Sequence, residues 1–128
     1  MLTSEANLGP TKTYEELYAD IVKAAKLAAE RGSYIFDLYY FGHGQKIKED
    51  GTGAGDWALF DGKRFTLINV FEAIKEGGFR NLVKITNQSC FSGGWPIEAC
   101  RLWYSKHPCV SNFDKIEVYS SADAFTPV

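Results

Sequence analysis

Two apolar runs constrain the fold of this chain more than any other feature of its sequence. The first, Tyr34–Phe41, contains one charged residue, Asp37, and does not alternate between apolar and polar positions. That pattern is typical of a strand that is covered on both faces, as in a parallel sheet. The second run, Leu82–Asn87, predicts another buried strand.

Helical patterns separate these strands. Thr13 with Glu16 three residues later has the form of a capping box, and Gly32 suits the position after a helix, so we expect a helix over 13–30. The alternation of helices and strands predicts one α/β domain with a parallel sheet and right-handed crossovers. The other expected elements are a strand at 57–60, a helix along Leu67–Ile74, a helix from Pro96 to about Tyr104 and a strand at 116–120.

Composition excludes several classes of protein. The 128 residues are 45% hydrophobic with a formal net charge of -2, which is typical of a globular domain and does not favour nucleic acid as a partner. No apolar run approaches the roughly 18 residues of a membrane helix. The N-terminus lacks a signal-peptide pattern and three cysteines do not suggest a disulfide framework, so we expect a cytoplasmic protein with free thiols.

Two reactive side chains follow the two apolar strands. His43 comes just after the first strand, and Cys90 comes just after the second. Because the carboxyl ends of parallel strands meet at one edge of a sheet, we expect these side chains to lie close together in the fold. A thiol beside an imidazole is the arrangement that nucleophilic catalysis needs. Gly44 would let the backbone approach a substrate carbonyl and donate its N–H.

The residues around both side chains resemble a known family. Phe41–Gly44 and Gln88–Gly94, each preceded by an apolar strand, are similar to the histidine and cysteine motifs of the caspase–hemoglobinase clan of cysteine peptidases, which includes caspases, metacaspases and legumains. The resemblance implies an endopeptidase in which Cys90 attacks the scissile carbonyl and forms a thioester, while His43 protonates the leaving amine. It also implies that the N–H groups of Gly44 and Cys90 bind the oxyanion, that the substrate is a polypeptide, and that no cofactor is needed.

The resemblance, which covers approximately residues 13–121, implies a larger fold than this chain provides. Clan members form a three-layer α/β/α sandwich around a mainly parallel sheet. They usually have a strand, a helix and a second strand before the helix at 13–30, and Met1–Ser4 would be the tail of that second strand. We therefore expect a partial domain, without the first strand and the C-terminal subdomain, that shows an exposed apolar strip beside Tyr34–Phe41. A partner chain or the missing subdomain would complete it.

Two further positions concern the substrate. Gln88 stands where clan members line the pocket for the residue that precedes the cut, and Ser121 is near the close of the strand that helps to shape that pocket. Caspases flank this glutamine with two arginines, but the arginines of this chain do not fall where the resemblance would put them. The sequence therefore names no preferred substrate residue, and it favours a polar or neutral one slightly.

The remaining candidates point to structure rather than chemistry. Cys100, Cys109 and His107 lack the paired spacing of a zinc site, so no metal is expected, and Cys100 is expected to face the core from its helix. The Gly-rich segment 45–56 predicts a flexible surface loop. Two other functions stay open: a non-catalytic caspase-like module or inactive fragment that binds partners, and another hydrolase, such as an amidase, that uses the same pair of residues.

Overall fold

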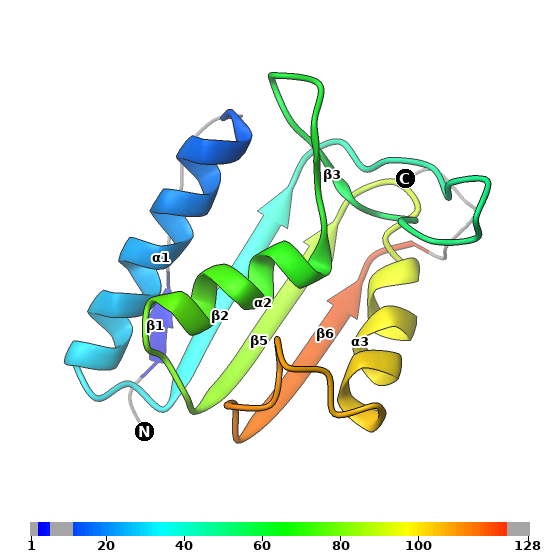
Figure 1. The fold of residues 1–128 in the computed structure, drawn as a ribbon. Helices are drawn as coiled ribbons and strands as arrows, with labels where there is room; N and C mark the ends of the chain where they lie inside the picture. Colours follow the sequence, from blue (N-terminus) through cyan, green and yellow to red (C-terminus); the bar gives the residue numbers. More distant parts are fainter. Residues whose placement is uncertain (1–2, 6–11, 123–128) are drawn as a thin grey trace.

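The computed structural model describes residues 3–5 and 12–122, and these residues form a parallel sheet with helices packed against it (Figure 1). The predicted α/β class is confirmed. The elements are β1 (Thr3–Glu5), α1 (Tyr14–Glu30), β2 (Ile35–Phe41), β3 (Trp57–Ala58), β4 (Arg64–Phe65), α2 (Leu67–Glu76), β5 (Leu82–Gln88), α3 (Gly94–Tyr104) and β6 (Lys115–Ser120).

The strands of the main sheet lie in the order β1-β2-β5-β6, and every pair is parallel. β2 and β5 pair along their whole length, from Ile35 opposite Leu82 to Phe41 opposite Gln88. β1 is paired only with the first three residues of β2. The expected tail of a strand at Met1–Ser4 is therefore found in part, since Thr3 and Ser4 belong to β1, while residues 1 and 2 lie outside the described part of the chain.

Each crossover moves one strand further in the same direction, so right-handed crossovers place all three connecting helices on the same face of the sheet. The packing agrees, because α2 contacts both α1 and α3 (Figure 1). The described residues thus form two layers, one of helices and one of sheet. The third layer of the expected α/β/α sandwich is not formed by any described residue.

One hydrophobic core fills the space between the helices and the sheet. Alternate residues of β2 and β5, among them Phe36, Leu38, Val83 and Ile85, are buried against the helices. The capping box at Thr13 is present and starts α1 as predicted. The apolar faces of the helices contribute Leu17, Ile21, Ala25 and Ala28 from α1, Leu67, Val70, Phe71, Ala73 and Ile74 from α2, and Trp95, Ala99 and Leu102 from α3.

The other face of β2 is exposed, which corrects the prediction of a strand covered on both faces. The exposed fractions of Tyr39 and Phe41 are 55% and 80%, and Tyr119 on β6 is 48% exposed. The expected apolar strip beside Tyr34–Phe41 is therefore present. It is interrupted by charge, because the Lys84 ammonium lies 5.6 Å from the centre of the Tyr119 ring.

Two further differences from the prediction have local causes. A second sheet pairs β3 with β4 across the turn at Asp61 and Gly62, where the sequence predicted only the first strand. α3 begins at Gly94, so Pro96 is its third residue, which costs no hydrogen bond because the first N–H groups of a helix have no partner within it.

Within the described ranges, none of the helices has both the length and the apolar character needed to cross a bilayer.

Candidate functional site

The register between β2 and β5 brings the two predicted catalytic residues to the same edge of the sheet. Phe41 is paired with Gln88, and this is the last pair of the ladder. His43 is two residues past the end of β2, and Cys90 is two residues past the end of β5. The two segments therefore leave the ladder at the same level. Figure 1 shows the arrowheads of β2, β5 and β6 at this common edge.

Gly44 is in direct contact with the backbone of Cys90. A Cβ atom built on Gly44 would fall on the carbonyl oxygen of Cys90, and it would come within 2.6 Å of the Ser89 hydroxyl and 3.0 Å of the Ser89 Cβ. No side chain larger than hydrogen fits there without a shift of backbone. The sequence after His43 thus requires glycine because the two loops at this edge touch.

Hydrogen bonds on either side of Gly44 fix its peptide planes. The His43 carbonyl accepts from the Ala58 N–H at 3.0 Å, and the Gln45 N–H donates to the Asp56 carbonyl at 2.8 Å. Gly44 itself forms an isolated bridge opposite Trp57. This arrangement, which we call the Gly44 clamp (the backbone bonds of His43 and Gln45 to 55–58), sets the direction in which the Gly44 N–H points.

Tyr40 supports the turn at His43 through its hydroxyl and its ring. Its hydroxyl donates to the His43 carbonyl at 2.9 Å, and its ring stacks on Trp57 with the centroids 4.1 Å apart. Burial raises the pKa of Tyr40 to about 12, so the phenol keeps the proton that it donates at neutral pH. The backbone of His43 is therefore held from two directions.

The turn after Cys90 is tight and strained. Phe91 has a φ of 61°, in the left-handed region that non-glycine residues seldom adopt, and α3 begins at Gly94. Holding a bulky residue there costs on the order of 1–3 kcal/mol, and such strain is found most often at functional sites. The turn is packed under the loop at 45–56, since a Cβ on Gly55 would come within 2.8 Å of the Ser92 Cα and 2.9 Å of the Phe91 carbonyl oxygen.

The chemical groups at this edge are open to a ligand. His43 is exposed and Cys90 is half-buried. Within the described residues, no hydrogen bond joins the thiol to the imidazole, and neither the Gly44 N–H nor the Cys90 N–H donates to another group. Two backbone donors and a thiol thus lie together without internal partners, which is the set of groups that binds and attacks a carbonyl.

Gln88 and Ser121, the predicted substrate contacts, also lie at this edge. Gln88 is the last residue of β5 and is half-buried. The ladder between β5 and β6 ends at Asn87 opposite Ser120, and the exposed Ser121 then donates its N–H to the Asn87 carbonyl at 3.3 Å. The structure therefore brings both residues to the edge that holds His43 and Cys90: Gln88 ends β5, and Ser121 follows β6.

Sequence reasoning missed a buried polar group beside this edge. Asp56 is 3% exposed, and its carboxylate accepts from Arg64 Nε at 3.1 Å and from Trp95 Nε1 at 3.3 Å. Arg64 also donates to the carbonyls of Lys46 and Gly53, at 2.6 and 2.9 Å. We call these three side chains the Asp56 hub (Asp56, Arg64 and Trp95). The only sequence signal was an acid and an arginine flanking the short hairpin.

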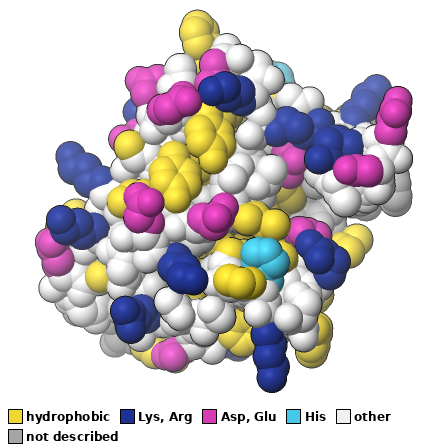
Figure 2. Space-filling view, in the orientation of Figure 1, with side chains coloured by type: hydrophobic (Ala, Val, Ile, Leu, Met, Phe, Trp, Pro, Cys, Tyr) yellow, Lys and Arg dark blue, Asp and Glu magenta, His cyan; other side chains and the backbone are white. Residues whose placement is uncertain are grey.

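The hub ties the loop at 45–56, which the sequence predicted to be flexible, to the rest of the fold. Arg64 bridges both arms of the loop, and the Asn87 side chain donates to the Gly55 carbonyl at 3.0 Å. The Ser89 hydroxyl in turn donates to the Asn87 side-chain oxygen at 2.7 Å. Figure 2 shows Lys and Arg side chains gathered on the side of the molecule where this loop protrudes.

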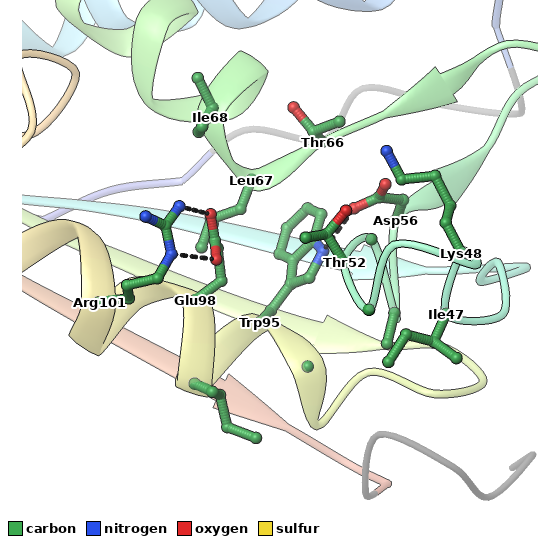
Figure 3. A pocket seen from close by; sticks show the side chains of 15 residues that line it. Ile47, Lys48, Thr52, Asp56, Thr66, Leu67, Ile68, Trp95, Glu98 and Arg101 are labelled. Carbon is green, nitrogen blue, oxygen red and sulfur yellow. Dashed lines mark hydrogen bonds and ion pairs between the residues drawn. The ribbon is translucent and has the colours of Figure 1, made fainter.

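A cavity of about 580 Å³ lies on the other side of the loop, between the N-terminal turns of α2 and α3. Figure 3 shows Trp95 and Asp56 joined at its floor and the Glu98–Arg101 ion pair at its wall. Neither His43 nor Cys90 lines it. The cavity is therefore separate from the edge where the candidate catalytic groups meet.

The chain matches no family model, no curated protein and no solved structure.

The other two cysteines lie in different surroundings. Cys100 is exposed, which corrects the expectation that it faces the core: Ala99 and Leu102 turn to the sheet, and Cys100 lies about 100° round the helix from Ala99. Cys109 is buried, and burial raises the pKa of its thiol to about 11. Within the described residues, no three His, Cys, Asp or Glu side chains are grouped as metal ligands.

Asp56 should leave a signature in the pH dependence of stability. Burial raises the pKa of this carboxyl above its ordinary value of 3.8, against the opposing effect of the hydrogen bonds from Arg64 and Trp95. The folded chain therefore keeps a proton that the unfolded chain releases, so the contribution of Asp56 to stability falls as pH rises from 3.8 through the folded pKa. We expect the free energy of unfolding of the wild type, minus that of Asp56→Asn, to fall over this range in chemical denaturation. A difference that rises with pH would contradict the assigned direction.

Proposed function

We propose that this chain is the catalytic part of a caspase-like cysteine endopeptidase, with Cys90 as nucleophile and His43 as its acid and base. The observation that carries the proposal is the meeting of His43–Gly44 with Cys90 at the end of the β2–β5 ladder. A histidine, a thiol and two backbone donors without partners among the described residues come there from segments far apart in the sequence. The resemblance of the two motifs to the caspase–hemoglobinase clan supports the same chemistry.

The reaction follows from these groups. The Cys90 sulfur attacks the carbonyl carbon of a peptide bond while the thiol proton passes to His43, and the oxygen that becomes negative is held by the N–H groups of Gly44 and Cys90. The carbon–nitrogen bond breaks while His43 gives a proton to the leaving amine, which leaves a thioester on Cys90. Water, with its proton taken by His43, then attacks the thioester carbon and releases the acid and the free thiol.

The substrate is proposed to be a polypeptide that lies across the sheet edge. Gln88 and Ser121 stand beside the reacting groups on β5 and after β6, and they would contact the residue that precedes the cut. Gln88 is a neutral hydrogen-bonding side chain, which favours a polar or neutral residue at that position. The proposed third layer and the missing strands of the clan would be supplied by another part of the protein or by a partner chain.

A second function is favoured by a different observation. The uncovered face of the sheet, with Tyr39 and Phe41 exposed, is a surface on which another chain could pack. A non-catalytic caspase-like module would use that face and would have no need of a reactive thiol. The reactivity of Cys90 therefore separates the two functions.

The test is competitive labelling with electrophilic peptides that carry Gln, Asp or Arg before the reactive group. If the chain is a peptidase, the bound electrophilic peptide should label Cys90 at least about 10²-fold faster than the exposed Cys100. Iodoacetamide should show no such preference. Cys109 serves as the internal control that stays unlabelled, because it is buried and protonated.

The variant His43→Ala should remove the preference for Cys90 and leave the labelling of Cys100 unchanged. Labelling of Cys90 and Cys100 at equal rates by every peptide in the set would reject the peptidase and leave the binding module as the better function.

A further inference from the structure

We infer that Asp56 is a positioning residue of this site: through the hub with Arg64 and Trp95 it sets the position of the Gly44 N–H relative to Cys90. The inference rests on the proposed function, because it assigns the oxyanion donor a support. It adds residues that neither motif contains, and it gives the loop at 45–56 a role in the reaction.

Backbone hydrogen bonds form a path from Asp56 to Gly44. The backbone carbonyl of Asp56 accepts from the Gln45 N–H at 2.8 Å, and the Gly55 N–H donates back to the Gln45 carbonyl at 2.9 Å. Gln45 directly follows the donor residue Gly44, and Gly44 forms an isolated bridge opposite Trp57. The peptide that carries the Gly44 N–H therefore moves whenever the backbone at 55–57 moves.

The backbone at 55–57 is held by the side chain of Asp56. The Asp56 carboxylate uses one oxygen for Arg64 and the other for Trp95, so a single buried group is bonded to two other segments. Arg64 belongs to β4, and its guanidinium also ties the carbonyls of Lys46 and Gly53. Buried ion pairs of this kind fix geometry more than they add stability, because the removal of two charges from water offsets their attraction.

The same carboxylate is also connected to the nucleophile. Trp95 is the second residue of α3, and α3 starts immediately after the strained turn that follows Cys90. Trp95 is 1% exposed, and its ring stacks on Trp57 with the centroids 4.9 Å apart. Asp56 thus bonds at once to the clamp that orients the donor and to the helix that follows the nucleophile (Figure 3). The carboxylate therefore links the two halves of the site.

The test compares Asp56→Asn with Asp50→Asn in the full chain. Both changes neutralise an aspartate of the same loop. Asp50 is exposed, accepts hydrogen bonds from Thr52 and pairs with Lys48 at 3.9 Å, all within its own turn, so it is the matched control. Three quantities are measured: alkylation of Cys90 by iodoacetamide, the inhibition constant of a peptide aldehyde, and kcat and KM for peptide hydrolysis. An aldehyde forms a tetrahedral adduct whose oxygen needs the Gly44 donor, whereas alkylation needs only the thiol.

For Asp56→Asn we expect alkylation within about twofold of wild type, an inhibition constant raised about tenfold and kcat lowered by about 10- to 100-fold with KM nearly unchanged, since displacement of an oxyanion donor acts on the transition state. Asp50→Asn should match wild type in all three. The variant Arg64→Lys, which keeps the charge without the planar fork, should give a smaller loss in the same direction. Equal losses in alkylation and in aldehyde binding, or an unchanged kcat, would overturn the positioning role.

Amide hydrogen exchange keeps this inference separate from the proposed function. If the clamp depends on Asp56, the amides of Gln45 and Ala58 exchange at least about tenfold faster in Asp56→Asn than in Asp50→Asn, whether or not the chain cleaves peptides. Unchanged exchange of both amides would overturn the positioning role. Faster exchange in a chain whose wild type neither cleaves peptides nor binds the aldehyde would keep the structural link and reject the endopeptidase instead.

Discussion

Replacing Cys90 with alanine should reduce peptide hydrolysis by about 10³-fold or more, because a reaction that forms a thioester has no route without the sulfur. The fold should survive the change. Cys90 is half-buried in a turn and its side chain makes no hydrogen bond within the described residues, so the free energy of unfolding should change by no more than about 1 kcal/mol. Hydrolysis of a fluorogenic peptide and a denaturant titration measure the two effects.

The control for this variant is Cys100→Ala, which removes the same chemical group from an exposed position on α3. Its activity should equal that of wild type, and its stability should change by no more than about 0.5 kcal/mol. Equal losses of activity in the two variants would show that the nucleophile has been assigned to the wrong cysteine.

The second large effect is expected for Gly44→Ala. The new Cβ would fall on the Cys90 carbonyl and against Ser89, so the two loops at the sheet edge must separate. We expect kcat to drop by about 10²-fold, since a displacement of about 1 Å at reacting groups has that effect. Overpacking of this kind should also lower the free energy of unfolding by about 1–3 kcal/mol. Steady-state kinetics and denaturant unfolding of the same preparation separate the two quantities.

Gly62→Ala is the matched control for the loss of stability. Gly62 has a φ of 79° in the turn between β3 and β4, and a Cβ there meets open space. Alanine should therefore cost about 1–2 kcal/mol through backbone strain alone, with kcat unchanged. A loss of activity in Gly62→Ala as large as that in Gly44→Ala would mean that the site fails through general destabilisation, and the contact between Gly44 and Cys90 would lose its role.

The sequence was sufficient to predict the parts of the fold that depend on local pattern. The apolar runs at 34–41 and 82–87 became β2 and β5, and the capping box at Thr13 became the start of α1. The contact of Gly44 with Cys90 followed from one rule about parallel strands, because both motifs end adjacent strands. These features depend on neighbours in sequence or on a pairing that the apolar content alone favours.

The features that the sequence did not reveal depend on the direction in which side chains point after the elements pack. Cys100 faces solvent because it is one position past Ala99, and no count of apolar residues along α3 separates the two. β2 is apolar on both faces, yet within the described residues only one face is covered by helices. The Asp56 hub joins residues of a loop, a strand and a helix, and no spacing along the chain marks such a contact.

The central claim is that the fold brings the Cys90 thiol and the His43 imidazole together, and one distance tests it most directly. In a crystal structure of the full chain, the Cys90 Sγ atom and the nearer His43 ring nitrogen should lie within about 7 Å, since catalytic hydrogen bonds are often long before substrate binds. A separation above roughly 10 Å, with both residues well ordered, is beyond what side-chain rotation can close and would contradict the proposed catalytic pair.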